Sequence, residues 1–171
     1  MSAITELCPQ CGLCCNGVLF GDVELKRGDD AKRLASLGIE LFAKGGRKAF
    51  SQPCACFDGS LCTIYADRPK QCRAFECRQV RLVGSGKVTI AAAKKNIREA
   101  RRRADEVLRL VRECGDVNEA MPLNKRYAAV MARPMNLAED ETFIEQRGEL
   151  MLAVGTLVEM LERDFLTADV A

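Results

Sequence analysis

The sequence predicts an α+β protein in which a small cysteine-rich module with short strands is covered by two or three α-helices. Nine of the ten cysteines lie between Cys8 and Cys77, so this part of the chain differs in composition from the rest. Beyond it, apolar residues recur at helical spacing. No linker rich in Ser, Gly or Pro separates the two parts. We therefore expect a cysteine-cluster module over residues 1–78 and a hairpin plus helices over residues 79–171, packed together as one compact domain.

Within the first part, turn and capping residues indicate where short elements begin and end. The stretch NGVLFGDVEL, residues 16–25, predicts a short strand. The stretch GDDAKRLASLG, residues 28–38, predicts a helix with aspartates at its start and a glycine at its end. Asp58-Gly59 predicts a turn, and CTIY at residues 62–65 predicts a second short strand.

The second part predicts one hairpin and then helices. Residues 79–90 contain two β-rich runs around Gly84-Ser85-Gly86, which is a hairpin signal. Apolar residues at helical spacing predict long helices over residues 94–114 and 137–165. A shorter helix is expected over residues 123–132, ending before a proline.

Composition limits the function classes. A chain of 171 residues with 48% hydrophobic residues can bury a real core, so it has no need of a disulfide scaffold. Residues 1–7 contain no basic, apolar leader, and no stretch approaches the roughly 20 apolar residues of a membrane span. We therefore expect a cytoplasmic protein with reduced thiols and no membrane partner. A net charge of +2 does not by itself imply a polyanionic partner.

The run CPQCGLCC places four thiols in eight residues, at Cys8, Cys11, Cys14 and Cys15. Thiolates are ligands of both structural zinc and iron–sulfur clusters, and a C-x2-C step lets two of them approach one centre. The adjacent pair is different, because neighbouring side chains diverge and fit poorly around one small ion. We expect Cys14 or Cys15 to serve a second metal or another corner of a cluster.

The absence of histidine removes several alternatives. Cys2His2 zinc fingers, Rieske centres and zinc deaminases all need histidine ligands. A Cys-His nucleophile pair is excluded for the same reason. The remaining prediction is metal binding through thiolates alone, at one or two centres.

The two cysteine blocks together resemble the CxxCxxCC family of zinc- or iron-chelating proteins (YkgJ-like). The resemblance rests on CPQCGLCC and on the later block CACFDGSLCTIYADRPKQCR, and it covers roughly residues 8–78. It implies that the metal ligands include Cys8, Cys11, Cys14, Cys15, Cys54, Cys62 and Cys72, with Cys77 a common addition. Cys56 stands where the family often has an apolar residue, so we treat it as an extra or alternative ligand. Cys114 falls on the apolar face of a helix and is expected in the core.

The identity of the metal and its use are separate questions. We favour an iron–sulfur cluster narrowly over zinc, because the adjacent cysteines suit a polynuclear centre. The cluster would serve a redox, metal-handling or structural role, with a protein partner possible but unidentified. A cluster-dependent enzyme, methylase- or oxidoreductase-like, is the first alternative. A zinc module that binds nucleic acid is the second, and it is disfavoured because acidic residues interleave with Arg101, Arg102 and Arg103.

Overall fold

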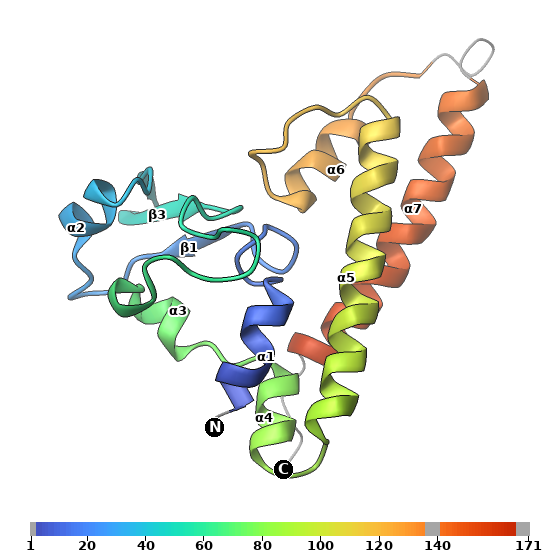
Figure 1. The fold of residues 1–171 in the computed structure, drawn as a ribbon. Helices are drawn as coiled ribbons and strands as arrows, with labels where there is room; N and C mark the ends of the chain where they lie inside the picture. The colour runs from blue at the N-terminus through green and yellow to red at the C-terminus, as the bar shows by residue number, and fades with distance from the viewer. Residues whose placement is uncertain (1–2, 136–140, 167–171) are drawn as a thin grey trace.

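The computed structural model describes residues 3–135 and 141–166. In chain order the elements are α1 (Ala3–Cys11), β1 (Asp22–Glu24), α2 (Ala31–Ser36), β2 (Phe42–Lys44), β3 (Arg47–Ser51), η1 (Tyr65–Asp67), α3 (Lys70–Ala74), α4 (Arg78–Gly84), α5 (Ile90–Glu113), α6 (Leu123–Met131), α7 (Glu141–Leu161) and η2 (Glu162–Leu166). The short elements from β1 to α3 gather on one side, and the long helices α5 and α7 run side by side on the other (Figure 1). The predicted α+β class is confirmed.

The sheet has three antiparallel strands in the order β1-β3-β2. Strands β2 and β3 form a hairpin that turns at Gly45 and Gly46, both with positive φ. Val23 of β1 lies opposite Phe50 of β3. Both side chains are buried with Leu34 of α2 in a small core beneath the sheet, which we call the sheet core. The predicted strand within residues 16–25 is thus present as β1, whereas β2 and β3 were not predicted.

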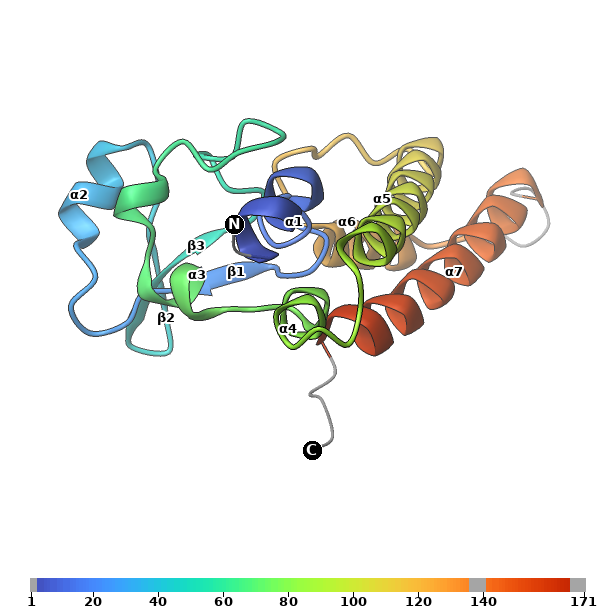
Figure 2. The ribbon, with the colours of Figure 1, turned by 60° about the horizontal axis from the view of Figure 1, so that its bottom comes forward.

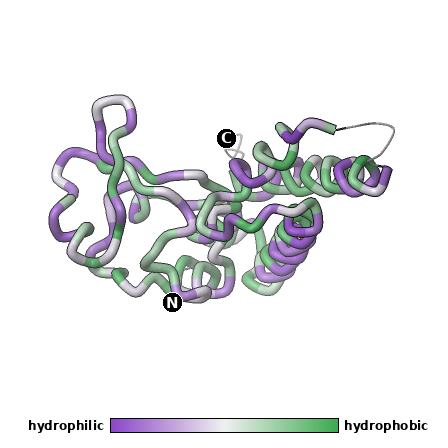
Figure 3. The backbone as a smooth tube through the Cα atoms, turned by 90° about the horizontal axis from the view of Figure 1, so that it is seen from above, coloured by the Kyte–Doolittle hydropathy of each residue, from purple (hydrophilic) through white to green (hydrophobic). Residues whose placement is uncertain are grey.

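The helices form a second and larger core, which we call the helical core. Helix α5 packs against α7 and against α1, and α4 packs against α1 and η2 (Figures 1 and 2). Hydrophilic and hydrophobic residues alternate along the long helices, as amphipathic packing requires (Figure 3). The most deeply buried side chains of this core include Leu7, Leu13, Val107, Leu110, Val111, Val130, Leu150 and Phe165. In the described part of the chain, no helix has the length and apolarity to cross a membrane.

Most predicted helices are confirmed with shifted ends. Residues 28–38 contain α2, where the Asp30 carboxylate accepts a hydrogen bond from the backbone N–H of Arg33 over 2.9 Å. Gly38 follows with positive φ and ends the helix as expected. The helices predicted after it correspond to α5, α6 and α7, and η2 continues α7. The start of the last prediction, residues 137–140, lies outside the described residues.

The predicted hairpin over residues 79–90 is wrong. These residues form α4, a turn and the first residue of α5. The backbone N–H of Gly86 bonds to the carbonyl of Val83 over 3.0 Å, and that of Lys87 bonds to the carbonyl of Leu82 over 2.9 Å. This is the hydrogen-bond pattern of a Schellman motif, in which a left-handed glycine ends a helix. The glycine signal therefore marks a helix C-terminus, and Val80 is buried against the helical core.

The predicted strand over residues 62–65 is also wrong, although the turn before it is correct. Gly59 has a φ of +98°, and the Asp58 carboxylate accepts hydrogen bonds from two following backbone amides. Phe57 and Cys62 then form only an isolated antiparallel bridge. A 3-10 turn, η1, then begins at Tyr65.

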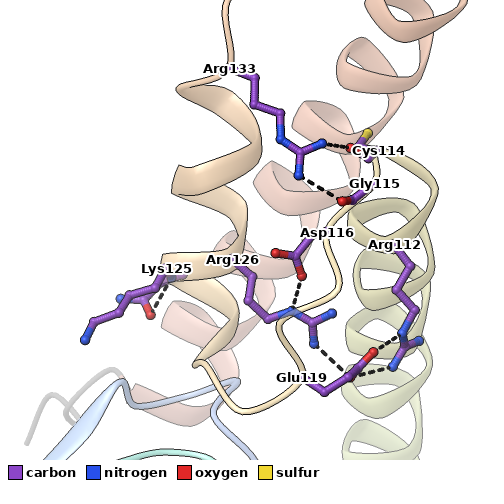
Figure 4. Close-up of polar contacts among 9 residues, drawn as sticks. Arg112, Cys114, Gly115, Asp116, Glu119, Lys125, Arg126 and Arg133 are labelled. Atoms are coloured by element: carbon purple, nitrogen blue, oxygen red, sulfur yellow. Dashed lines mark hydrogen bonds and ion pairs between the residues drawn. The ribbon is translucent and has the colours of Figure 1, made fainter.

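At the upper end of the helical layer in Figure 1, a buried ion pair joins α6 to the segment after α5. Arg126 Nε donates to the Asp116 carboxylate over 2.7 Å, and the two side chains are 2% and 7% exposed. The guanidinium also donates to Glu119 over 3.0 Å, and Arg112 reaches Glu119 from α5 (Figure 4). The buried charge of Arg126 is compensated because the oppositely charged Asp116 is buried beside it.

Candidate metal centre

The N-terminal cysteine run begins on a helix. Cys8 and Cys11 lie three residues apart on α1, so both face the same side of that helix. Gly12 ends the helix with a φ of +68°, a left-handed conformation that favours glycine. The backbone N–H of Cys15 then bonds back to the carbonyl of Gly12 over 2.8 Å. Cys14 and Cys15 therefore sit in a tight turn directly after the helix.

The later cysteine block is held against this run by specific contacts. The backbone N–H of Cys54 donates to the carbonyl of Cys15 over 2.8 Å. The hydroxyl of Ser60 donates to the carbonyl of Pro9 over 3.1 Å. A Cβ placed on Gly12 would lie only 2.5 Å from the tip of the Phe57 ring, so the two segments pack tightly there. Loop geometry thus brings together cysteines that are far apart in the sequence.

The last two cysteines of the block come from short helices. Cys72 lies in α3, which packs against β1. The N-terminus of α3 is tied down by Asp29, whose carboxylate accepts from the backbone N–H of Lys70 over 2.9 Å. Cys77 is the N-cap residue of α4, the helix that packs against α1. Cys72 therefore belongs to the sheet side of the molecule and Cys77 to the helical side.

One set of thiols gathers around α1 and the start of α4. Desolvation, followed by repulsion from Cys77, raises the pKa of Cys8 to about 11, although the residue is partly exposed. Burial raises the pKa of Cys11 to about 12, and Cys77 repels this thiolate as well. Burial also raises the pKa of Cys14 well above its usual value, with repulsion from Cys11 and Cys77 as the next causes. We call these residues the first group: Cys8, Cys11, Cys14 and Cys77.

A different set of thiols surrounds Cys15. Burial raises the pKa of Cys15 to about 12. The next causes are repulsion from three thiolates of the later block, those of Cys54, Cys72 and Cys62. Burial raises the pKa of Cys72 to about 11, with Cys54 and Cys62 as the next causes. We call these residues the second group: Cys15, Cys54, Cys62 and Cys72.

Two further cysteines are buried in the hydrophobic cores, and one of them, Cys56, also lies beside Cys54 of the second group. Cys56 is 4% exposed within the sheet core, and its thiol donates to the carbonyl of Leu37 at 3.4 Å. Cys114 is 2% exposed in the helical core, at the C-cap of α5. The expected core position of Cys114 is confirmed.

Arg68 is a cation shared by the two groups. Its guanidinium stacks on the Tyr65 ring at 3.6 Å from the ring centroid, and Nε donates to the Tyr65 carbonyl over 3.3 Å. Burial raises the pKa of Cys8 in the first group and of Cys72 in the second, and the charge of Arg68 partly opposes both increases.

The donor set suits a metal that prefers sulfur. Eight thiols from five separate segments lie in two electrostatically coupled groups, and the chain offers no imidazole. Among residues 3–135 and 141–166, no three Cys, Asp or Glu side chains converge closely enough to hold an ion. The fold thus brings the thiols into two neighbourhoods. Side-chain rotation would still have to bring the sulfur atoms of each neighbourhood together around a metal.

Sequence reasoning missed the contact between Gly12 and Phe57 and the shared position of Arg68. Gly12 carried a usable signal, because a glycine inside a cysteine run often marks a left-handed turn. The position of Arg68 near both groups has no local signal, since Cys8 and Cys72 come from different segments.

Comparison with known proteins agrees with these observations. Searches among curated proteins and among solved structures found no match. Residues 7–97 match the family model described as "CxxCxxCC: Putative zinc- or iron-chelating domain". This match spans more than half of the chain and includes both cysteine blocks, so the chain belongs to the CxxCxxCC family.

Proposed function

We propose that this protein binds metal through cysteine thiolates alone, as an iron–sulfur protein with a redox, metal-handling or structural role. The observation that carries the proposal is the gathering of eight thiols around α1, α3 and α4 in a chain without histidine. Membership of a zinc- or iron-chelating family supports the same conclusion. Thiols that served only as small packing residues would not need to gather in these two groups.

Iron–sulfur chemistry is favoured over zinc by the spacing of the ligands. The run C-x2-C-x2-C, completed by one distant cysteine, is the ligand pattern of a [4Fe–4S] cluster in bacterial ferredoxins. Cys8, Cys11 and Cys14 supply the run, and Cys77 lies in the same group. When bound, such a cluster would supply one-electron chemistry. The protein's own contribution is the burial of the thiols and the nearby charge of Arg68.

Anaerobic purification tests this proposal. Iron and acid-labile sulfide should be present in comparable amounts, with a broad visible absorption that reductant bleaches. Zinc without sulfide would assign the thiols to zinc and reject the iron–sulfur proposal. A chain that retains neither metal after reconstitution under reducing conditions would refute thiolate metal binding altogether.

A further inference from the structure

Cys14 and Cys15 are neighbours in the chain but face different surroundings. After burial, the strongest causes of the raised pKa of Cys14 are the charges of Cys11 and Cys77. After burial, the strongest causes of the raised pKa of Cys15 are the charges of Cys54, Cys72 and Cys62, all from the later block. The charge of Cys15 raises the pKa of Cys14 less than those of Cys11 and Cys77 do, and the charge of Cys8 raises the pKa of Cys15 less than those of Cys54, Cys72 and Cys62 do. The peptide unit between Cys14 and Cys15 is therefore the border between two thiol neighbourhoods.

Packing separates five of the eight residues in the same way, independently of charge. Cys11 is part of the helical core, and Cys77 packs against it. Cys54, Cys62 and Cys72 pack against the sheet core instead. Each group thus has its own hydrophobic support, and these two cores contain different secondary-structure elements.

Backbone contacts attach Cys15 to the second group. Its carbonyl accepts from the Cys54 amide over 2.8 Å, which fixes the distance between these two residues in the folded chain. Phe57 and Cys62 form a bridge in the same block, and the carbonyl of Cys54 accepts from the Phe57 amide over 3.0 Å. Cys15, Cys54 and Cys62 are therefore connected through a short hydrogen-bonded path.

Cys56 lies beside Cys54, whose pKa its charge raises, but its thiol has a partner of its own in the sheet core. Its side chain points into the sheet core, where only 4% of the residue is exposed. Its thiol is engaged as a donor to the Leu37 carbonyl, and a thiolate could not make that bond. Without Cys56 and Cys114, eight of the ten cysteines remain, four in each group.

We propose that the chain holds two separate four-thiolate centres, one formed by the first group and one by the second, with adjacent Cys14 and Cys15 belonging to different centres. This inference rests on the proposed metal binding and adds the number of centres and the ligands of each. The first centre lies between α1 and α4. The second joins the turn after α1 to the later block and α3.

Differential alkylation of the wild-type protein tests the assignment directly. Metal-free protein is loaded with half of its full metal content, treated with a thiol reagent, and its labelled cysteines are identified by peptide mass spectrometry. We expect protection to rise together within each group and independently between the groups. Protection of Cys14 and Cys15 as one unit would overturn the proposal.

Substitutions provide the matched comparison. Cys77→Ser and Cys72→Ser should each retain about half of the wild-type metal, and the double variant should retain almost none. Cys56→Ser and Cys114→Ala should retain all of it. Complete loss in either single variant, together with joint protection of all eight thiols, would indicate one shared centre. Wild-type protein that binds no metal would instead refute the proposed function, so the two failures are distinguishable.

Discussion

The backbone N–H of Cys54 donates a hydrogen bond to the carbonyl oxygen of Cys15 over 2.8 Å, and this contact joins the two cysteine-rich segments. It uses no side-chain atom, so both thiols stay available as ligands. A backbone tie of this kind lowers the entropy lost when a metal closes the loop between the segments. We therefore expect the fold to hold Cys15 and Cys54 close together before any metal arrives.

The packing of Gly12 against Phe57 should be needed for metal binding. In Gly12→Ala the new methyl group would overlap the Phe57 ring and force the later block away from the run. We expect weaker metal binding and a lower unfolding temperature. The control is Gly46→Ala, where φ is also positive at +77° but no atom lies within 4 Å of the position that the new methyl group would take. Each variant should lose roughly 1–2 kcal/mol of stability to the left-handed conformation.

The measurement is metal content per chain after equal exposure to a competing chelator. Gly12→Ala should lose more metal than Gly46→Ala. Equal losses in the two variants would show that the contact with Phe57 contributes nothing beyond backbone strain.

Removal of the metal should loosen the cysteine-rich part more than the long helices. The ligands of the second group close a loop of about 40 to 60 residues, so metal-binding free energy becomes folding free energy for that segment. Hydrogen exchange should accelerate most between Cys15 and Cys72 after chelation, whereas α5 and α7 keep their protection. Uniform acceleration along the chain would mean that the helical core also depends on the metal.

Sequence patterns predicted those parts of the fold that depend on local information. Residues 94–114 form a helix because one apolar face repeats along the whole segment, and α2 follows from the Asp30 cap and Gly38. The error at residues 79–90 has a physical cause. A glycine with positive φ suits both a hairpin and a helix C-terminus, and the choice depends on burial of Val80 against distant helices.

The candidate site shows the same division. The cysteines could be named from their spacing and from the family resemblance, because ligand type and local spacing are sequence properties. Their division into two groups could not, since Cys15 is assigned by its contact with Cys54 and by the thiolates around it. The burial of Cys56 likewise depends on β1 and α2, which approach it from elsewhere in the chain.

The metal-free protein should lose stability as the pH rises above 9. The pKa of Cys8 and Cys72 is raised to about 11 and that of Cys11 and Cys15 to about 12, chiefly by burial, from an ordinary value of 9.0. Above pH 9 the unfolded chain releases these protons first, so the folded state binds more protons and its stability falls with pH. The stabilisation is complete below pH 9 and is lost as the pH rises through 11 to 12.

Urea denaturation of reduced, metal-free protein at increasing pH measures this effect. The midpoint should decline above pH 9, and the decline should be shallower in Cys11→Ala, which lacks one of the buried thiols. Metal-loaded protein should show little decline, because its ligands are already deprotonated. A midpoint that is flat in the metal-free protein would contradict the burial of these thiols.

The ion pair between Arg126 and Asp116 should be important for folding and irrelevant for metal. Arg126→Met leaves the Asp116 carboxylate buried without the guanidinium that faces it, and such a change destabilises by about 3–5 kcal/mol. Adding Asp116→Leu should recover much of this loss, because no buried charge then remains. Arg112→Met, which removes a half-exposed partner of Glu119, should have a much smaller effect. Chemical denaturation gives the stabilities, and metal content should stay at the wild-type value in every variant that folds.

Arg68 should support both centres at once. Four thiolates around Zn²⁺ or a [4Fe–4S]²⁺ cluster carry a formal charge of about −2, so two neighbouring centres repel each other unless a cation lies near both. We propose Arg68 as that cation, because its charge lowers the pKa of Cys8 in the first group and of Cys72 in the second. Arg68→Gln keeps polar hydrogen-bond donors but removes the charge, and changes next to metal ligands typically lower affinity by about 10- to 100-fold. We expect both centres to weaken in chelator competition, with Arg68→Lys less affected and exposed Arg73→Gln close to wild type. Weakening of one centre alone, read out by alkylation of Cys8 and Cys72, would show that Arg68 serves a single group.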